Sequence, residues 1–258
     1  MASLDATRCD KKWRPCNAGR AYATGRLRLV EAARGEARFI ALEGPDGAGK
    51  SSVAERLEAR LVAEGHSVHM TREPGGTRLG ELVRGILLDT ASVARAPETD
   101  AFLFNAARSQ LVREVIRPAL ARGEVVVCDR FSDSTLAYQG YGSGVDLAML
   151  RDLEARATGG LRPDLVILLD VPVAVGLARR GRGDPGSLTR FEDEARHDAA
   201  FHERVRAGYL ELAGAEPWRW RVIDADRPRD DVAEAVARAV LRFLGASEPN
   251  NHLARIHG

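Results

Sequence analysis

The amino-acid sequence predicts an α/β fold in which helices cover both faces of a parallel β-sheet. Short runs that are apolar almost throughout, such as Glu124–Asp129 and Asp164–Asp170, alternate with longer segments of helical periodicity. Strands that lack an alternating polar face are typical of a parallel sheet buried on both sides. The composition agrees, because 45% of the residues are apolar and 29% are charged, as in folded soluble domains.

The expected elements follow one another in a regular order. Strands are expected at residues 38–43, 67–71, 124–129, 164–170 and 220–223. Helices are expected at residues 49–64, 79–88, 98–122, from the end of the third strand through 138, and at 146–157, 173–180, 192–213 and 229–244. Helices separate all successive strands, which is the arrangement that produces parallel pairing.

The length of 258 residues suits one domain with tails. Residues 38–244 are expected to fold, and residues 245–258 to form a frayed C-terminal tail. Residues 1–37 are basic and contain few acids, and we expect a disordered extension or a wrongly assigned start codon. An organelle transit peptide is the alternative, although the segment is not rich in serine. It has no apolar stretch of the kind found in secretory signals.

The charge and cysteine content exclude several functional classes. The net charge is +1, from 38 basic and 37 acidic residues, so no overall field attracts nucleic acid or a membrane surface. No apolar run approaches the roughly 18 residues of a membrane span. The spacing of Cys9, Cys16 and Cys128 does not form a zinc site. We therefore expect a cytoplasmic protein without nucleic-acid or membrane partners.

A phosphate-binding loop follows the first expected strand. The segment matches GxxxxGK(S/T) in full and consists of Gly44, Pro45, Asp46, Gly47, Ala48, Gly49, Lys50 and Ser51, followed by Ser52. Glycines let successive backbone N–H groups face a phosphate at the positive end of a helix. Lys50 supplies a charge for the β- and γ-phosphates of ATP, and the Ser51 hydroxyl is a Mg²⁺ ligand in such loops. The motif predicts nucleotide binding but does not identify the acceptor.

Further charged and aromatic residues are expected at the same edge of the sheet. Arg72 ends the second strand and Asp129-Arg130 ends the third, and ligands of open α/β sheets bind at this edge. We expect Asp129 to hold Mg²⁺, partly through water, and Arg130 to bridge two phosphates. Phe104 and Arg108 are four residues apart and share a helix face, where they could stack a base and bond its edge. Taken alone, such a pair is more often a core residue beside a surface residue.

Five segments together resemble the bacterial thymidylate kinases, in the order and spacing of that family. Besides the phosphate loop they are TREPGGT (71–77), LFNAAR (103–108), CDRFSDSTLAYQGYGSG (128–144) and RPDLVILLDV (162–171). The resemblance extends over residues 38–244. It implies a five-stranded parallel sheet of the P-loop NTPase type, a homodimer, and the phosphorylation of dTMP to dTDP by ATP-Mg in dTTP biosynthesis.

The resemblance also implies a role for each residue of the acceptor site. Phe104 would stack on thymine and Arg108 would bond its edge, with Thr135 and Gln139 contributing to base recognition. Arg72 and Arg84 would approach the acceptor phosphate, and Arg130 would lie between the phosphoryl groups. Asp46 would meet the sugar 3′-hydroxyl, and Tyr138 would crowd the ribose 2′ position. Asp46 is a small departure, because many bacterial relatives carry Glu there.

The glycine-rich stretch 179–190, here called the lid, is expected to be a mobile loop. In one subgroup of the family the catalytic arginine lies on the phosphate loop, and in the other it lies on the lid. Gly47 and Ala48 occupy the loop position here, so the lid must supply the charge. Its arginines are Arg179, Arg180, Arg182 and Arg190, about half of which are expected to be merely solvated. We expect Arg182 and Arg190 to be catalytic together with Lys50 and Arg130, and which of the four lid arginines reaches the phosphates stays open at this point.

Two alternatives stay open at this point. The acceptor could be another nucleotide or deoxynucleoside, which an acceptor panel would reveal. The chain could instead be a P-loop nucleotide switch or partitioning ATPase, which would hydrolyse ATP slowly without an acceptor. That alternative gives no reason for the TREPGGT segment or for the lid arginines.

Overall fold

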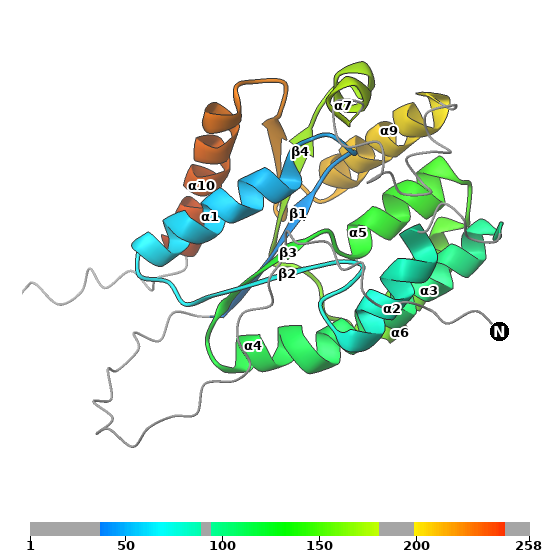
Figure 1. The fold of residues 1–258 in the computed structure, drawn as a ribbon, viewed down its shortest axis with the longest axis horizontal. Coiled ribbons are helices and arrows are strands. Elements are labelled where there is room, and N and C mark those ends of the chain that lie inside the picture. Colours follow the sequence, from blue (N-terminus) through cyan, green and yellow to red (C-terminus); the bar gives the residue numbers. More distant parts are fainter. Residues whose placement is uncertain (1–36, 89–93, 181–198, 246–258) are drawn as a thin grey trace, which may run out of the picture. The chain divides into compact units, whose positions relative to one another are not determined.

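The computed structural model describes residues 37–88, 94–180 and 199–245. Within these residues five strands form one parallel sheet in the order β2-β3-β1-β4-β5 (Figure 1). The strands are β1 (Arg38–Glu43), β2 (Val68–Arg72), β3 (Val125–Asp129), β4 (Leu165–Asp170) and β5 (Trp220–Asp224). The expected five-stranded parallel sheet is confirmed. The N-terminal extension, most of the lid and the C-terminal tail lie outside the described residues.

The register of the strands gathers the predicted polar residues at the carboxyl edge. Asp129 of β3 is level with Leu42 of β1 on one side and with Arg72 of β2 on the other. Glu43 and the phosphate loop follow directly after Leu42. The last residues of three adjacent strands thus form the floor of one site, as expected for an open α/β sheet.

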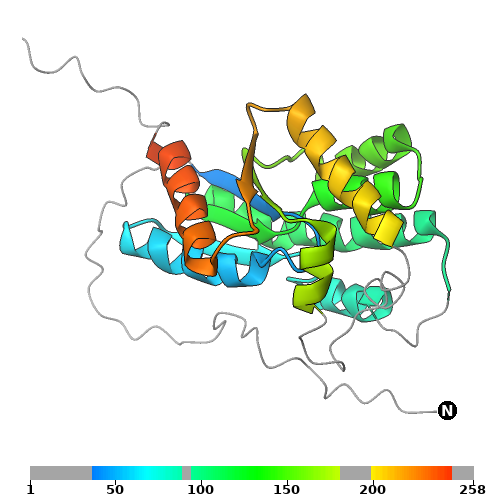
Figure 2. The ribbon, with the colours of Figure 1, turned by 90° about the horizontal axis from the view of Figure 1, so that it is seen from above.

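Helices cover both faces of the sheet (Figures 1 and 2). One face is covered by α1 (Lys50–Ala63) and α10 (Arg229–Gly245). The other is covered by α3 (Pro97–Leu111), η1 (Val112–Ile116), α4 (Arg117–Ala121), α5 (Ser132–Thr135), η2 (Leu136–Gly142), α6 (Leu147–Thr158) and α9 (Ala199–Ala215). Two further helices, α2 (Arg78–Leu88) and α7 (Val173–Arg180), complete the described part.

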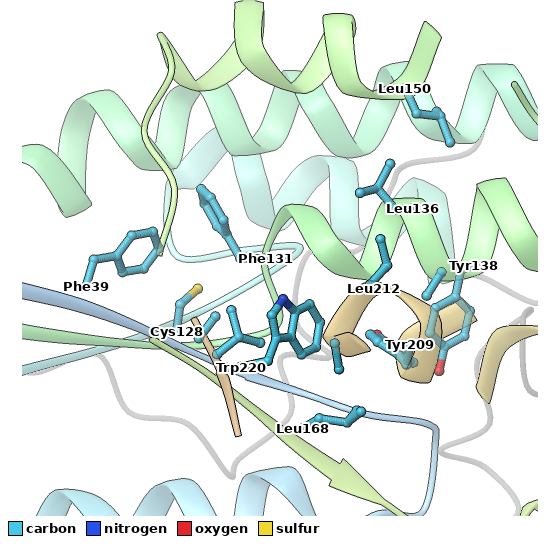
Figure 3. Packing of buried hydrophobic residues seen from close by; sticks show 14 of the residues in the cluster. Phe39, Cys128, Phe131, Leu136, Tyr138, Leu150, Leu168, Tyr209, Leu212 and Trp220 are labelled. Carbon is cyan, nitrogen blue, oxygen red and sulfur yellow. The ribbon is translucent and has the colours of Figure 1, made fainter. Parts of the chain in front are cut away.

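The sheet divides the apolar core in two. Along β1, Phe39 and Ala41 point to the α3–α9 side, while Ile40 and Leu42 point to the α1–α10 side. Phe39 packs edge-on against Phe131 with ring centroids 4.8 Å apart (Figure 3). Because both faces are buried, the residues between Arg38 and Glu43 are all apolar, and this produces the continuous apolar pattern in the sequence.

Two local features differ from simple helical periodicity. The expected helix at 98–122 contains a π-helical turn, η1, between α3 and α4. The helix after β3 also continues past Tyr138 as a wide π-helical segment that ends at Gly142. Arg179 and Arg180 form the last turn of α7, in agreement with the helix expected at 173–180. No helix in the described ranges has both the length and the apolar character needed to cross a membrane.

Candidate active site

The phosphate loop joins β1 to α1 and can be built only with glycine at its first position. Gly44 has φ 142°, and a methyl group there would lie 2.4 Å from the carbonyl oxygen of Leu169 on β4. No side chain fits so close to a neighbouring backbone. The loop therefore lies directly on the edge of the sheet and leads into the positive end of α1, where anions bind.

Lys50 is buried inside the loop. Its Nζ donates to the carbonyl oxygens of Gly44 at 2.8 Å and Pro45 at 2.9 Å. Burial lowers the pKa of Lys50 to about 8, and the charge of Arg130 acts in the same direction. An anion placed next to Lys50 would stabilise its charged form, so the loop favours a phosphate ligand.

Ser51 and Asp129 form a pair suited to Mg²⁺. The Ser51 hydroxyl donates to Oδ2 of Asp129 at 3.2 Å, so the first residues of α1 and the end of β3 meet. The other carboxylate oxygen, Oδ1, is buried and has no hydrogen-bond partner within the described residues. The described part of the chain contains no cluster of three or more His, Cys, Asp or Glu side chains that could hold a metal ion. One hydroxyl and one carboxylate suit Mg²⁺, which takes its remaining ligands from water and phosphate.

Arg130 is the most heavily bonded side chain of the site. Its backbone has φ 69°, a left-handed conformation that costs a non-glycine residue about 1–2 kcal/mol. Its guanidinium donates to Asp46 at 2.6 Å and to the carbonyl oxygen of Gly44 at 3.1 Å. It also donates to the hydroxyls of Ser134, Tyr138 and Tyr209, each at 3.2 Å. These bonds hold Arg130 against the phosphate loop.

Asp46 links the phosphate loop to the helix after β3. Its second carboxylate oxygen accepts a hydrogen bond from the Tyr138 hydroxyl at 3.0 Å. Burial raises the pKa of Asp46, but the charges of Arg130, Lys50 and Arg180 outweigh it and lower the pKa to about 2. Asp46 is therefore an anion at neutral pH, and Asp46, Arg130 and Tyr138 form one connected group.

Glu43 stabilises this group through shared hydrogen-bond partners, and the sequence alone did not predict this role. It is fully buried and accepts hydrogen bonds from the Phe131 N–H at 2.8 Å, the Ser134 hydroxyl at 2.6 Å and the Tyr209 hydroxyl at 2.9 Å. Tyr209 belongs to α9 and lies beside Tyr138 (Figure 3). Burial and the charge of Asp133 raise the pKa of Glu43. The only sign of this role in the sequence is that an acidic residue ends an apolar strand directly before the loop.

Arg108 on α3 is only 1% exposed and has a separate set of partners. Its Nε donates to Glu73 at 2.8 Å, and Nη1 donates to Asn105 at 3.1 Å. Nη2 donates to Thr135 at 3.0 Å and to the Phe131 carbonyl oxygen at 3.4 Å. The structure thus brings Arg108 and Thr135 together, and it adds Glu73, which had no assigned role in the sequence.

The other predicted base-site residues lie on the same two helical segments. Phe104 is half-buried on α3 and packs against the cluster of Val83, Leu87 and Ala107. Gln139 is buried on η2, directly after Tyr138. The π-helical geometry of η2 changes the regular four-residue spacing that the sequence suggested for Thr135 and Gln139.

Two more arginines occupy the β2–α2 side of the site. Arg72 at the end of β2 pairs with Glu81 at 3.2 Å. Arg84 on α2 donates to the Pro74 carbonyl oxygen at 3.0 Å. Burial lowers the pKa of Arg84, and the neighbouring charge of Arg72 adds to this effect. An anion between the two would relieve their repulsion.

Of the lid arginines, Arg182 and Arg190 lie outside the described residues. Arg179 donates to the Ala225 carbonyl oxygen at 2.9 Å and pairs with Asp226 at 3.4 Å. These bonds hold Arg179 on the loop between β5 and α10. Arg180 differs, because its charge contributes to the low pKa of Asp46.

Glu154 on α6 has an unusual pKa and is close enough to Arg108 to be affected by its charge. It is buried, and its Oε1 has no hydrogen-bond partner within the described part of the chain. Burial raises the pKa of Glu154 to about 8, although the positive charge of Arg108 opposes the shift. The folded protein therefore keeps this carboxyl protonated at pH values where the unfolded chain ionises it.

This difference predicts a pH-dependent stability. Between its ordinary pKa of 4.5 and about 8, the unfolded chain releases a proton that the folded protein retains, so stability falls as the pH rises. Glu154→Gln is always neutral, and at pH 8 it should raise the free energy of unfolding by on the order of 2 kcal/mol. Urea denaturation at pH 5 should show almost no difference. Glu55→Gln, on the exposed side of α1, is the control. A gain in the free energy of unfolding of Glu154→Gln that is equal at both pH values would contradict the prediction.

Comparison with known proteins identifies the family to which this site belongs. The family model for thymidylate kinase matches residues 42–236. A thymidylate kinase of Deinococcus radiodurans is 53% identical over 203 residues, which cover 78% of this chain and 95% of that protein. One of Thermomicrobium roseum is 56% identical over 206 residues, 80% of this chain and 95% of the relative. The matched region contains the phosphate loop, Arg130 and Arg108, and the chain belongs to the thymidylate kinase family.

Proposed function

We propose that the protein transfers the γ-phosphoryl group of ATP to dTMP and releases dTDP and ADP. The position of Arg130 carries the proposal. Its guanidinium contacts the phosphate loop through Gly44 and the acceptor-side group through Asp46 and Tyr138. A cation held between two nucleotide sites is what transfer between two phosphates requires.

The donor site is the phosphate loop. ATP phosphates would take the place of the loop carbonyls as partners of Lys50 and would be bound by the N–H groups at the start of α1. Ser51 and Asp129 would hold Mg²⁺, with the buried Asp129 Oδ1 available for a bound water. When bound, Mg²⁺ neutralises charge on the β- and γ-phosphate oxygens.

The acceptor base would lie on Phe104 beside Arg108. A guanidinium has five N–H groups, and four of those on Arg108 are donated to partners within the described residues. The remaining N–H is on Nη1 and can only donate. It suits a carbonyl oxygen on the base, such as that of thymine, and it repels the amino group that cytosine carries at the same place.

The acceptor phosphate would lie among Arg72, Arg84 and Arg130. Asp46 and Tyr138 would then face the sugar, with Asp46 accepting from the 3′-hydroxyl. Two observations support this placement: Arg72 and Asp129 are level in adjacent strands, and Asp46 is bonded to Arg130.

The chemistry requires no general base. An acceptor phosphate oxygen is already an anion, and it attacks the γ-phosphorus while the bond to the β–γ bridging oxygen breaks. Lys50 and Arg130 stabilise the charge on the transferring group and on the leaving ADP. Arg182 and Arg190 would add to this when the lid covers the site and excludes water.

The choice of acceptor tests the function directly. ADP release should be rapid with dTMP and at least about 100-fold lower in kcat/KM with dCMP, because a buried donor would be left facing a donor. dUMP keeps the carbonyl and lacks only a methyl group, so its loss should be smaller, roughly 10-fold or more. A coupled assay with each acceptor and with none measures this. Equal rates with and without dTMP would instead indicate an ATPase.

Removal of the Phe104 ring tests the base site. Phe104→Ala should raise KM for dTMP about 10-fold or more, because the stacking surface is lost. KM for ATP should change little, since the phosphate loop is untouched. Trp218→Ala is the control for loss of an aromatic side chain, because Trp218 is 72% exposed and lies between α9 and β5, outside the site. A similar increase in KM for both substrates would remove the stacking role of Phe104.

A homodimer is supported by an apolar stripe on α2. Leu79, Leu82 and Ile86 are exposed by 44%, 63% and 50%, and their spacing places them on one helix face. Phe102 on α3, which packs against α2, is exposed as well. A two-fold interface requires a patch of this self-complementary kind.

Light scattering after size exclusion tests the dimer. The wild type should have twice the 28.0 kDa mass of one chain. Leu82→Glu should shift the protein towards the monomer, because it would place two carboxylates in an apolar contact. Val62→Glu on α1, where the valine is 58% exposed, should remain dimeric. A monomeric wild type would contradict the proposal.

A further inference from the structure

Helix α6 turns a narrow stripe of residues toward the core. Its buried residues are Leu150, Glu154 and Thr158, which follow one another at intervals of four and therefore share a face. Leu150 belongs to the apolar cluster on that side of the sheet (Figure 3). Glu154 is the ionisable residue of the stripe and is only 8% exposed. A carboxyl group at such a position loses its hydration, so it requires either a partner or a proton.

The structure favours the proton. Oε1 of Glu154 is buried and accepts no hydrogen bond from the residues that the structure describes. Burial is also the main reason that the pKa of Glu154 is raised to about 8. The carboxyl group is therefore largely neutral at pH 7, and it ionises at pH values only slightly above this.

Several charged groups surround Glu154. Helix α6 packs against α3, and the charge of Arg108 on α3 favours ionisation of Glu154. Three acids oppose ionisation, namely Asp133 on α5, Glu73 after β2 and Glu43 at the end of β1. The acids of α3 itself lie in its first turn, more than two turns before Arg108. The segment η2 also packs against α6, but burial raises the pKa of its Tyr138 and Tyr141, so both stay neutral.

Arg108 has a single N–H group left for the base. Four of its five N–H groups are donated to partners in the described residues, and the fifth is on Nη1. This is the donor assigned above to a carbonyl oxygen of the base. A carboxylate on α6 would attract the same guanidinium strongly, whereas a neutral carboxyl group would attract it much less.

We propose that Glu154 is a positioning residue for the base site, which leaves Arg108 available to the base when it is neutral and competes with the base for Arg108 when it is ionised. The proposal rests on the base-binding role that the proposed function gives to Arg108. Glu154 acts through Arg108 and not on the substrate itself. Because dTMP would bind the neutral form more tightly, its binding should be linked to the uptake of a proton.

The pH dependence of dTMP binding tests the proposal, measured by calorimetry on the full chain without ATP. The Kd of the wild type should rise about 5-fold or more between pH 7 and pH 9, because the neutral, binding-competent form becomes a minority. Glu154→Gln is neutral at every pH, so its Kd should stay within about twofold over this range. At pH 7 the two proteins should bind dTMP alike, because Glu154 is then mostly protonated.

Asp152→Asn is the matched control, because it makes the same change from carboxyl to amide on the same helix. The Asp152 side chain is 63% exposed and pairs with Arg156 at 2.8 Å. This variant should keep the rise in Kd of the wild type. Glu73 and Lys50 are present in all three proteins, so their own titration does not affect the comparison. A wild-type Kd that does not change with pH, or the same rise in Glu154→Gln as in the wild type, would overturn the proposal.

The proton uptake gives a second readout, which a purely structural role of Glu154 would not change. Calorimetry at pH 8 in two buffers of different ionisation enthalpy measures the number of protons taken up with each dTMP. The wild type should take up about 0.3 proton more than Glu154→Gln, because Glu154 is partly ionised at this pH before dTMP binds. Equal uptake by the two proteins would contradict the proposed linkage.

The role of Glu154 and the proposed function can fail separately. If dTMP bound but was not phosphorylated, the function would fail in the acceptor assay, while the pH profile of Kd would still report on Glu154. If dTMP was phosphorylated but Glu154→Gln had the pH profile of the wild type, only the role of Glu154 would fail. A wild type that did not bind dTMP would contradict both.

Discussion

The ion pair between Arg130 and Asp46 is the interaction on which the rest of the site depends. It joins the residue after β3 to the phosphate loop at 2.6 Å, and Arg130 has a left-handed backbone conformation. Such a conformation persists only where its surroundings hold it. Three hydroxyls, one carbonyl and one carboxylate do so here. The cation is therefore placed before any substrate arrives, which is the condition for efficient electrostatic stabilisation.

The support for this pair comes from distant parts of the chain. Glu43 fixes Ser134 and Tyr209, and both of these hydroxyls contact Arg130. Asp133, beside Ser134, is held by both terminal nitrogens of Arg219 at 2.9 and 3.0 Å. Arg219 precedes β5, so the last strand of the sheet helps to orient the helix that follows the third. Buried charged side chains are stable only when they have hydrogen-bond or ion-pair partners, and Glu43, Asp133 and Arg219 all have them.

Much of the fold and the location of the site could be predicted from the sequence. Apolar strands and the glycine-rich loop are local patterns, and a parallel sheet brings Arg72, Asp129 and the loop to one edge by topology alone. The supporting residues could not be found in this way. Tyr209 is 166 residues from Glu43, and the pairing of Glu73 with Arg108 depends on how α3 packs. The π-helical turn that carries Tyr138 and Gln139 also has no local sequence signal.

The rate of the Arg130→Ala variant tests the central claim most directly. With dTMP and ATP present, kcat should fall about 100-fold or more, because the cation that we propose to act on both phosphates is lost. Circular dichroism and the unfolding midpoint should show that the sheet is intact, since the core on both faces does not involve this side chain. A folded variant with the wild-type kcat would contradict the claim that Arg130 organises phosphoryl transfer.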